Sequence, residues 1–170
     1  MRRTLDTNIC SYVLRRHPAA MLERFAQLQR DQLWLSAIVA AELRFGAAKL
    51  GSARFAAAVE AWLTGFAVQP WPVAATQHYA QVRAALERSG QPIGAMDLMI
   101  AAHAMAEDSV LVTNNAREFL RVPGLAVEEW TLGTSCYWAK TARSAGSCNA
   151  AWRCWAVSPR WTLTAASTAA

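Results

Sequence analysis

The sequence predicts an α/β protein with a central, mainly parallel β-sheet and helices on both faces of the sheet. Several short apolar runs lie far apart in the 170-residue chain. Longer segments with apolar residues at helical spacing separate these runs, and such an alternation is typical of a parallel sheet. The hydrophobic fraction of 54% and the charged fraction of 17% indicate a globular rather than a disordered chain.

Five of the short apolar runs are predicted to be strands. They comprise residues 3–5, 32–36, 66–68, 110–112 and 125–128. The segments between them are predicted to be helices. Thr7 or Asn8 can cap the first, and Pro18 suits the first turn of the second. Ser36 can cap a third helix, which Gly51 ends.

Further helices are predicted in the remainder of the chain. Apolar residues at helical spacing mark residues 53–64 and 74–88. Another helical stretch opens at Met96, after a loop over residues 89–94, and a short helix follows Asn115. The predicted elements are complete by about residue 130, which gives one domain of ordinary size.

Three carboxylates stand where an apolar core would not normally hold them. Asp6 ends the first strand, Glu42 lies inside an apolar helical stretch, and Asp97 opens another. Burial of an isolated ionised carboxylate costs several kcal/mol unless a partner compensates. Three such acids, far apart in sequence, suggest one shared partner, and a divalent cation is the natural candidate.

A fourth position joins these acids at one edge of the predicted sheet. Asp6 and Asn115 both come just after strands, and parallel sheets bind ligands beyond the carboxyl ends of their strands. Hard oxygen ligands suit Mg²⁺ or Mn²⁺, which can polarise a phosphoryl oxygen and lower the pKa of a bound water. Asp6, Glu42, Asp97 and Asn115 are therefore predicted to form a site for phosphodiester hydrolysis.

Four segments in this order resemble the signature segments of PIN-domain ribonucleases, and most closely the VapC-type toxins of bacterial toxin–antitoxin pairs. They are residues 5–8 (Leu-Asp-Thr-Asn), 41–46 (Ala-Glu-Leu-Arg-Phe-Gly), 97–103 (Asp-Leu-Met-Ile-Ala-Ala-His) and 111–119 (Leu-Val-Thr-Asn-Asn-Ala-Arg-Glu-Phe). The resemblance covers about residues 1–130. It implies a three-layer α/β/α domain that acts as a metal-dependent endoribonuclease and as the toxin of a type II toxin–antitoxin system.

The resemblance also implies roles for the four site residues. Asp6 and Asp97 would be ligands of Mg²⁺ or Mn²⁺, and Glu42 would complete the acidic set. Asn115 stands where many members have a fourth polar or acidic residue. An Asn removes one charge there, which puts a second tightly held metal ion in doubt, and Glu118 lies nearby as a partial substitute.

The same resemblance implies the partners of this chain. They are an RNA substrate, a cognate antitoxin protein and a second copy of the chain in a homodimer. The antitoxin is expected to place a helix or an extended segment in an apolar groove. The helices predicted over residues 8–16 and 53–64 are candidate walls of that groove.

Residues 131–170 differ in composition from the predicted domain. Residues 1–130 hold 13 basic and all 12 acidic residues, whereas the last forty hold four basic residues and no acid. The net charge of +5 therefore comes mostly from this C-terminal segment. It is interpreted as an atypical extension that is either unselected or disordered; the alternative is a native extension that docks on the domain or on a partner through its Trp residues.

No apolar run in the sequence is long enough to cross a membrane, and the N-terminus lacks the apolar core of a signal peptide. A cytoplasmic protein without membrane attachment is therefore expected.

Each acid also has a plainer interpretation. Asp6 could cap the first helix, and Asp97 could be a first-turn acid favoured by the helix dipole. Glu42 could be a solvated residue paired with Arg44 or Lys49. The alternative function is a catalytically inactive PIN-like module that binds nucleic acid or acts as a scaffold.

A third possibility is a phosphohydrolase with Asp6 as the nucleophile. That chemistry favours a second Asp two residues later, where this chain has Asn8.

Overall fold

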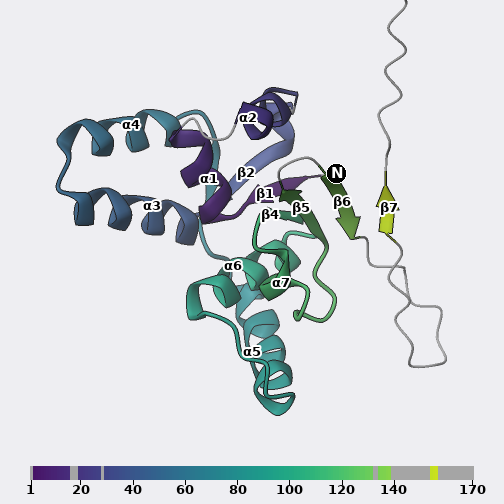
Figure 1. The fold of residues 1–170 in the computed structure, drawn as a ribbon. Coiled ribbons are helices and arrows are strands. Elements are labelled where there is room, and N and C mark those ends of the chain that lie inside the picture. Colours follow the sequence, from purple (N-terminus) through teal and green to yellow (C-terminus); the bar gives the residue numbers. More distant parts are fainter. Residues whose placement is uncertain (1, 16–18, 28, 132–133, 139–153, 157–170) are drawn as a thin grey trace, which may run out of the picture.

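The computed structural model describes residues 2–15, 19–27, 29–131, 134–138 and 154–156. At its centre is a parallel sheet of five strands in the order β3-β2-β1-β4-β5 (Figure 1). These strands are β1 (Arg3–Leu5), β2 (Leu33–Ser36), β3 (Ala67–Gln69), β4 (Val110–Thr113) and β5 (Val127–Thr131). The predicted fold class, with a central and mainly parallel sheet, is confirmed.

Helices cover both faces of this sheet. In Figure 1, α1 to α4 lie on one side of the strands and α5 to α7 on the other. They are α1 (Thr7–Leu14), α2 (Ala19–Ala26), α3 (Ala37–Leu50), α4 (Ala53–Leu63), α5 (Val73–Arg88), α6 (Ala95–Ala106) and α7 (Ala116–Phe119). Helix α3 packs on both α1 and α4, and α5 packs along α6. Within the described ranges, no helix combines the length and the apolar character needed to cross a membrane.

Local residue chemistry explains where these helices begin and end. The Ser36 hydroxyl accepts a hydrogen bond from the backbone N–H of Ile38 at 3.1 Å, and thereby caps α3. Gly51 ends α3 with a φ of 62°, a left-handed conformation that a side chain would strain. Ser52 caps α4 by accepting from the N–H of Phe55. The caps expected at Ser36 and Gly51 are therefore confirmed.

Three strands begin later than the sequence predicts. Strand β2 begins at Leu33 because Gln32 belongs to the preceding helical turn. Strands β3 and β5 begin later because the preceding turns use their first apolar residues. The N–H of Phe66 bonds to the carbonyl of Leu63, which leaves Phe66 in the turn that ends α4. Leu125 is buried, but its N–H bonds to the carbonyl of Val122 in a turn. Burial at these positions comes from turns packed on the core, and a pattern of apolar residues does not distinguish a turn from a strand.

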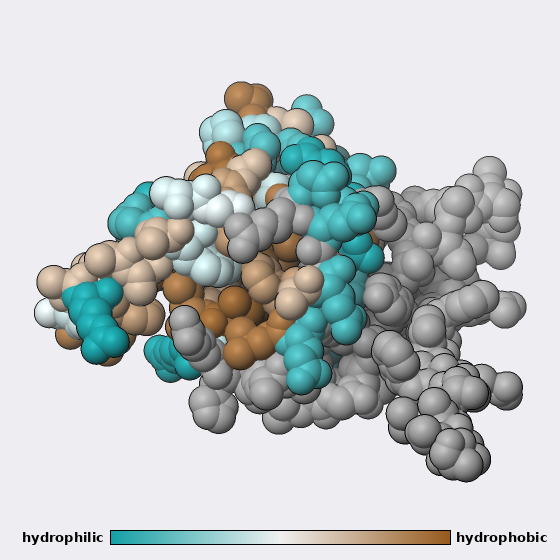
Figure 2. All heavy atoms as spheres, turned by 90° about the horizontal axis from the view of Figure 1, so that it is seen from above, coloured by the Kyte–Doolittle hydropathy of each residue, from teal (hydrophilic) through white to brown (hydrophobic). Residues whose placement is uncertain are grey.

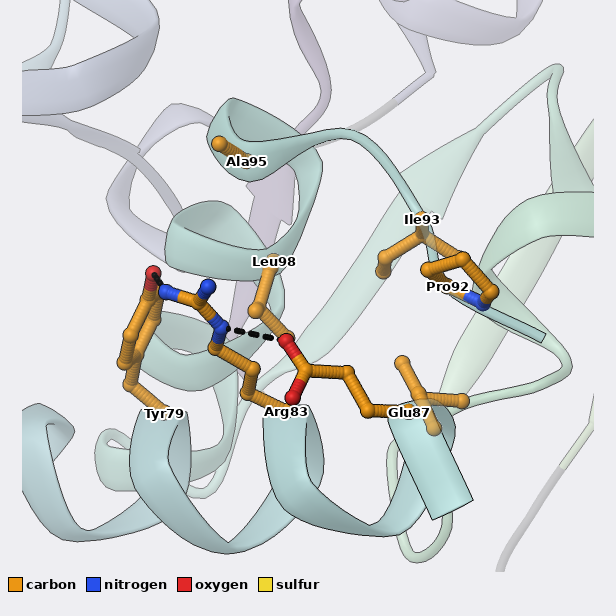
Figure 3. Close-up of a pocket in the computed structure, with 8 residues that line it drawn as sticks. Tyr79, Arg83, Glu87, Pro92, Ile93, Ala95 and Leu98 are labelled. Carbon is orange, nitrogen blue, oxygen red and sulfur yellow. Dashed lines mark hydrogen bonds and ion pairs between the residues drawn. The ribbon is translucent and has the colours of Figure 1, made fainter. Parts of the chain in front are cut away.

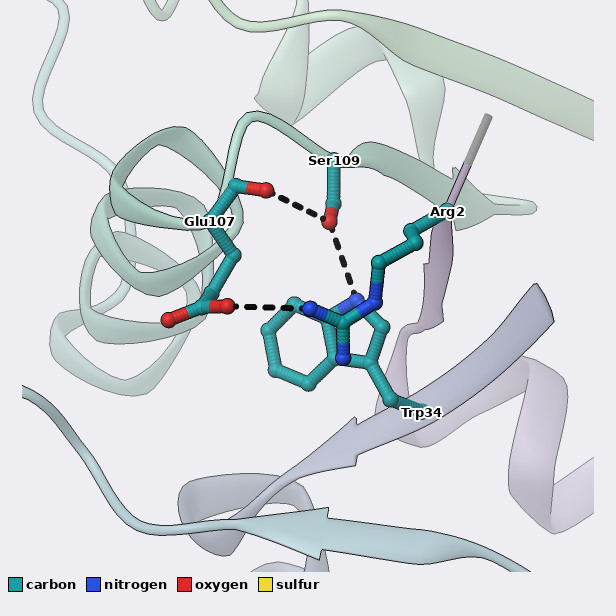
Figure 4. A network of polar contacts seen from close by, with 4 residues as sticks. All are labelled: Arg2, Trp34, Glu107 and Ser109. Atoms are coloured by element: carbon teal, nitrogen blue, oxygen red, sulfur yellow. Dashed lines mark hydrogen bonds and ion pairs between the residues drawn. The ribbon is translucent and has the colours of Figure 1, made fainter. Parts of the chain in front are cut away.

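A polar network joins three elements at the amino ends of β1 and β2 (Figure 4). The guanidinium of Arg2 lies 5.7 Å from the centroid of the Trp34 ring and donates to Glu107 at 3.2 Å. The indole N–H of Trp34 donates to the Ser109 hydroxyl at 3.0 Å, and that hydroxyl donates to the Glu107 carbonyl. These contacts fix β2 against the turn between α6 and β4.

Two further strands extend the sheet beyond β5. Strand β6 (Thr134–Trp138) pairs antiparallel with β5, and β7 (Cys154–Ala156) pairs antiparallel with β6. The rest of the predicted extension, residues 132–133, 139–153 and 157–170, lies outside the described residues. The boundary at residue 130 and the interpretation of the extension therefore stay predictions.

Replacement of the two serine caps tests how the start of α3 is stabilised. Ser36 is buried, and its hydroxyl also lies 2.8 Å from Nδ1 of the buried His103. Ser36→Ala removes the cap and leaves His103 without this partner, so we expect a loss of about 2–3 kcal/mol. Ser52→Ala removes only an exposed cap and should cost about 1 kcal/mol or less. Urea unfolding of both variants measures the difference, and equal losses would contradict this account.

Truncation after Trp130 tests the predicted domain boundary. The buried apolar residues that the structure describes lie between Leu5 and Trp130. The shortened chain should therefore still unfold cooperatively, as followed by circular dichroism. A large fall in melting temperature, or protection of all four tryptic sites after residue 130 in the full chain, would show that the extension is an integral part of the fold.

Candidate active site

Asp6 lies at the carboxyl end of β1, the central strand of the parallel sheet, and only 1% of its surface is exposed. Its backbone N–H continues the strand by bonding to the carbonyl of Val112 at 2.9 Å. Its Oδ2 accepts a hydrogen bond from the Thr113 hydroxyl at 2.8 Å. Its Oδ1 is buried and has no hydrogen-bond partner among the described residues.

The capping interpretation of Asp6 is wrong. Asp6 occupies the residue before α1, so neither Thr7 nor Asn8 is the cap, but the Asp6 side chain makes no capping hydrogen bond. Its buried oxygen therefore serves no evident purpose in the helix.

The surroundings of Asp6 favour its protonated form. Burial raises the pKa of the Asp6 carboxyl to about 6. The hydrogen bond from Thr113 opposes this effect on the pKa, and weaker contributions from the Thr7 backbone and the Asn8 side chain oppose it too, whereas repulsion by Asp97 adds to it. At neutral pH the carboxylate is held ionised against its surroundings, which is the condition that a nearby cation would relieve.

Asp97 connects Asp6 with two further acids. It is half-buried in the first turn of α6, and burial raises the pKa of its carboxyl. Repulsion by Glu118 and by Glu42 raises that pKa further. Asp97 thus interacts with Asp6 and also with Glu42 and Glu118, and the sequence singles out all four of these acids.

Glu42 is half-buried on α3, the helix that Ser36 caps. The sequence offers a pair between Glu42 and Arg44 as an alternative, and the structure does not contain that pair. Arg44 instead makes two hydrogen bonds to Glu60 of α4, at 2.7 and 2.8 Å. That exposed pair joins α3 to α4 and leaves Glu42 facing the charge of Asp97.

Asn115 follows β4 and precedes α7, as expected from the sequence. Its backbone N–H donates to the Thr113 hydroxyl at 2.9 Å, and its side chain does not cap α7. Thr113 therefore links the loop that holds Asn115 to the Asp6 carboxylate. The catalytic role predicted for Asn115 stays a prediction.

Two other positions shape the acidic site and have no signal in the sequence. A Cβ atom at Gly94 would lie 3.0 Å from Oδ2 of Asp97, so a side chain at this position would displace that carboxylate by a few tenths of an ångström. Arg121 donates to Glu118 at 3.1 Å and to the Pro92 carbonyl at 3.4 Å. These contacts tie the loop before α6 to the segment that follows α7.

The acids are neighbours but do not form a closed set of ligands. In the parts of the chain that the structure describes, no three His, Cys, Asp or Glu side chains are grouped closely enough to hold a metal ion. The chemistry of the donors nevertheless fits a hard cation, since an unpartnered buried carboxylate oxygen lies among mutually repelling acids. The assignment of Asp6, Asp97 and Glu42 as ligands stays a prediction.

Comparison with known proteins connects this arrangement to a family. The profile of the PIN domain matches residues 4–125. The chain is 41% identical over 128 residues to the tRNA(fMet)-specific endonuclease VapC of Shigella flexneri, an alignment that covers 75% of this chain and 96% of that protein.

Solved structures give the same result. A DNA-bound VapBC complex from Salmonella typhimurium contains a chain that matches with a TM-score of 0.71 and 39% identity, over 77% of this chain and 99% of that one. The VapBC2 complex from Rickettsia felis, bound to a DNA fragment from its promoter, matches with a TM-score of 0.70 and 35% identity. This match covers 77% of this chain and 100% of that one.

Asp6→Asn tests how much the ionised, buried carboxylate of Asp6 destabilises the folded state. Because the folded state raises the pKa of Asp6 from 3.8 to about 6, the group contributes stability below pH 4 that is lost as the pH rises through 6. In a chelator, the variant should therefore gain stability relative to the wild type between pH 4 and 7, by up to roughly 2–3 kcal/mol. Urea unfolding at both pH values measures this gain, and a gain that does not vary with pH would contradict it.

Proposed function

We propose that this chain is a metal-dependent endoribonuclease that acts as a toxin. The premise is its family: the chain belongs to the PIN-domain family and, within it, to the VapC ribonucleases. Its substrate would be RNA, and a cognate antitoxin protein would silence it in the cytoplasm. The observation that carries the proposal is the buried, unpartnered oxygen of Asp6 beside Asp97, with Glu42 and Glu118 close to Asp97. A purely structural site would pair such charges with basic residues, as Arg121 pairs with Glu118, whereas Asp6 accepts a hydrogen bond from the neutral hydroxyl of Thr113.

Mg²⁺ or Mn²⁺ is the cofactor that this set of donors favours. Asp6 and Asp97 would hold the ion directly, and Glu42 would complete the acidic set. When bound, the ion supplies polarisation of a phosphoryl oxygen and a water of lowered pKa.

The surrounding residues prepare the site for this role. Thr113 donates to one oxygen of Asp6, which fixes the carboxylate and leaves its other oxygen free. Glu42 or Glu118 can accept the proton of the attacking water at a carboxylate oxygen. Asn115 can donate a hydrogen bond to a phosphate oxygen but cannot take a proton at neutral pH.

An apolar surface supports the proposal that the chain binds an antitoxin. Seen from above, apolar residues gather in a hollow that hydrophilic residues border (Figure 2). Among the exposed apolar side chains are Tyr12 on α1 and Phe45 on α3, two helices that pack together. A helix or extended segment of the antitoxin would cover such a surface. A homodimer is proposed from the family alone.

Cleavage of an RNA pool tests the proposed activity directly. The wild-type chain should cleave single-stranded RNA with Mg²⁺ or Mn²⁺ and not in a chelator. Asp6→Asn and Asp97→Asn should each lower the rate about a hundredfold or more, because each removes a predicted ligand. Asp31→Asn changes an exposed acid outside the site and is the matched control. Equal rates for all four proteins would contradict the proposal, as would release of phosphate from small monoesters without cleavage of RNA.

Expression in a bacterial host tests the toxin role separately. Residues 1–130 alone should arrest growth, and Asp6→Ala should restore it, since the arrest depends on cleavage. Healthy growth with soluble, folded wild-type domain would instead favour the non-catalytic binding module.

A further inference from the structure

A pocket of about 230 Å³ lies between α5 and the start of α6 (Figure 3). Leu86, Ile93 and Leu98 give it an apolar lining. Tyr79 and Arg83 line it from α5. This combination of apolar walls and a few polar groups is typical of a small-molecule or nucleobase site.

The polar side chains of this pocket form a row along α5. Arg83 donates through Nε to Glu87 at 2.8 Å and through Nη1 to the Tyr79 hydroxyl at 3.1 Å. Its guanidinium also lies 5.9 Å from the centroid of the Tyr79 ring. An ion pair four residues apart on a helix is ordinary by itself. Here it stands beside an aromatic ring at the mouth of an apolar pocket, with a donor and an acceptor side by side.

The pocket and the acidic site share one loop and one helix. Ala95 and Leu98 line the pocket, and Asp97 lies between them in the sequence. Pro92 also lines the pocket, and its carbonyl accepts from Arg121, which in turn pairs with Glu118. A ligand group in this pocket would therefore lie close to a phosphodiester held at the acids.

We propose that this pocket binds a nucleobase of the RNA, one that flanks the cleaved bond. This inference rests on the proposed function. The ring of Tyr79 offers a planar surface on which a base can stack. Glu87 accepts from N–H groups of the base edge while Arg83 donates to a carbonyl oxygen. Guanine matches this pair best, because its ring N–H and amino group are adjacent and can both donate to one carboxylate.

Cleavage of a randomised single-stranded RNA pool, followed by sequencing of the product ends, tests this inference in the full chain. The wild type should show enrichment of guanine at one position near the cut. Glu87→Gln should reduce that enrichment to less than about twofold. Tyr79→Leu should raise KM about tenfold, the order expected for one stacked base. Circular-dichroism melts show that each variant folds.

Two matched variants separate recognition from general disturbance. Tyr79→Phe keeps the ring on which the base would stack, so its KM should lie well below that of Tyr79→Leu. Glu23→Gln removes an exposed carboxylate on α2 and should leave the base preference unchanged. An unchanged preference and KM in both Glu87→Gln and Tyr79→Leu would overturn the inference.

A binding measurement keeps this inference distinct from the nuclease proposal. If the wild type cleaves no RNA, fluorescence anisotropy with short labelled RNAs, with and without guanine, is measured in a chelator. Binding that favours guanine and weakens in Glu87→Gln and Tyr79→Leu would support the pocket although the nuclease proposal had failed. Equal binding by all variants would overturn the pocket as a base-binding site.

Discussion

The ionised carboxylate of Asp6, buried at the carboxyl end of the central strand, is the constraint on which this structure depends. Strand β1 lies between β2 and β4, so Asp6 stands in the middle of the sheet edge where the loops converge. Thr113 satisfies one of its oxygens, and Asp97 repels its charge. Burial of this charge beside Asp97 costs free energy that a bound cation would return, which is the proposed reason for an unfavourable group at this position.

The opposite end of the sheet stabilises the fold with paired charges. At the amino end of β1, Arg3 donates to the buried Glu128 at 2.9 Å, and Arg2 pairs with Glu107 beside Trp34. Opposite charges therefore meet at the amino ends of the strands. At the other edge Asp97 repels Asp6 and Glu42, although Glu118 pairs with Arg121. Packing and the amino-end contacts hold the strands together, so the fold tolerates this repulsion.

The sequence predicts the elements of this fold better than their ends or their long-range contacts. Alternation of apolar runs and the caps at Ser36 and Gly51 are local signals, and they predict the five parallel strands and the helices between them. Strands β6 and β7 are not predicted, because residues 131–170 show no periodic pattern of apolar residues. The later start of β5 depends on how Leu125 packs in a turn, which no local pattern records. Among the site residues, Asp6 and Asp97 stand out because they interrupt apolar segments. Arg121 does not, since its role comes from a contact with the loop before α6.

The site therefore combines acids that repel one another with a neighbouring pocket, which is lined in part by the loop before α6. The central proposal is that burial and repulsion by Asp97 keep the pKa of Asp6 near 6 until a divalent cation binds and lowers it. NMR titration of the side-chain carboxyl carbon of Asp6, with and without Mg²⁺, measures this directly. We expect the pKa of the Asp6 carboxyl to be near 6 in a chelator and clearly lower with Mg²⁺ present. An ordinary pKa near 4 that Mg²⁺ leaves unchanged would contradict it.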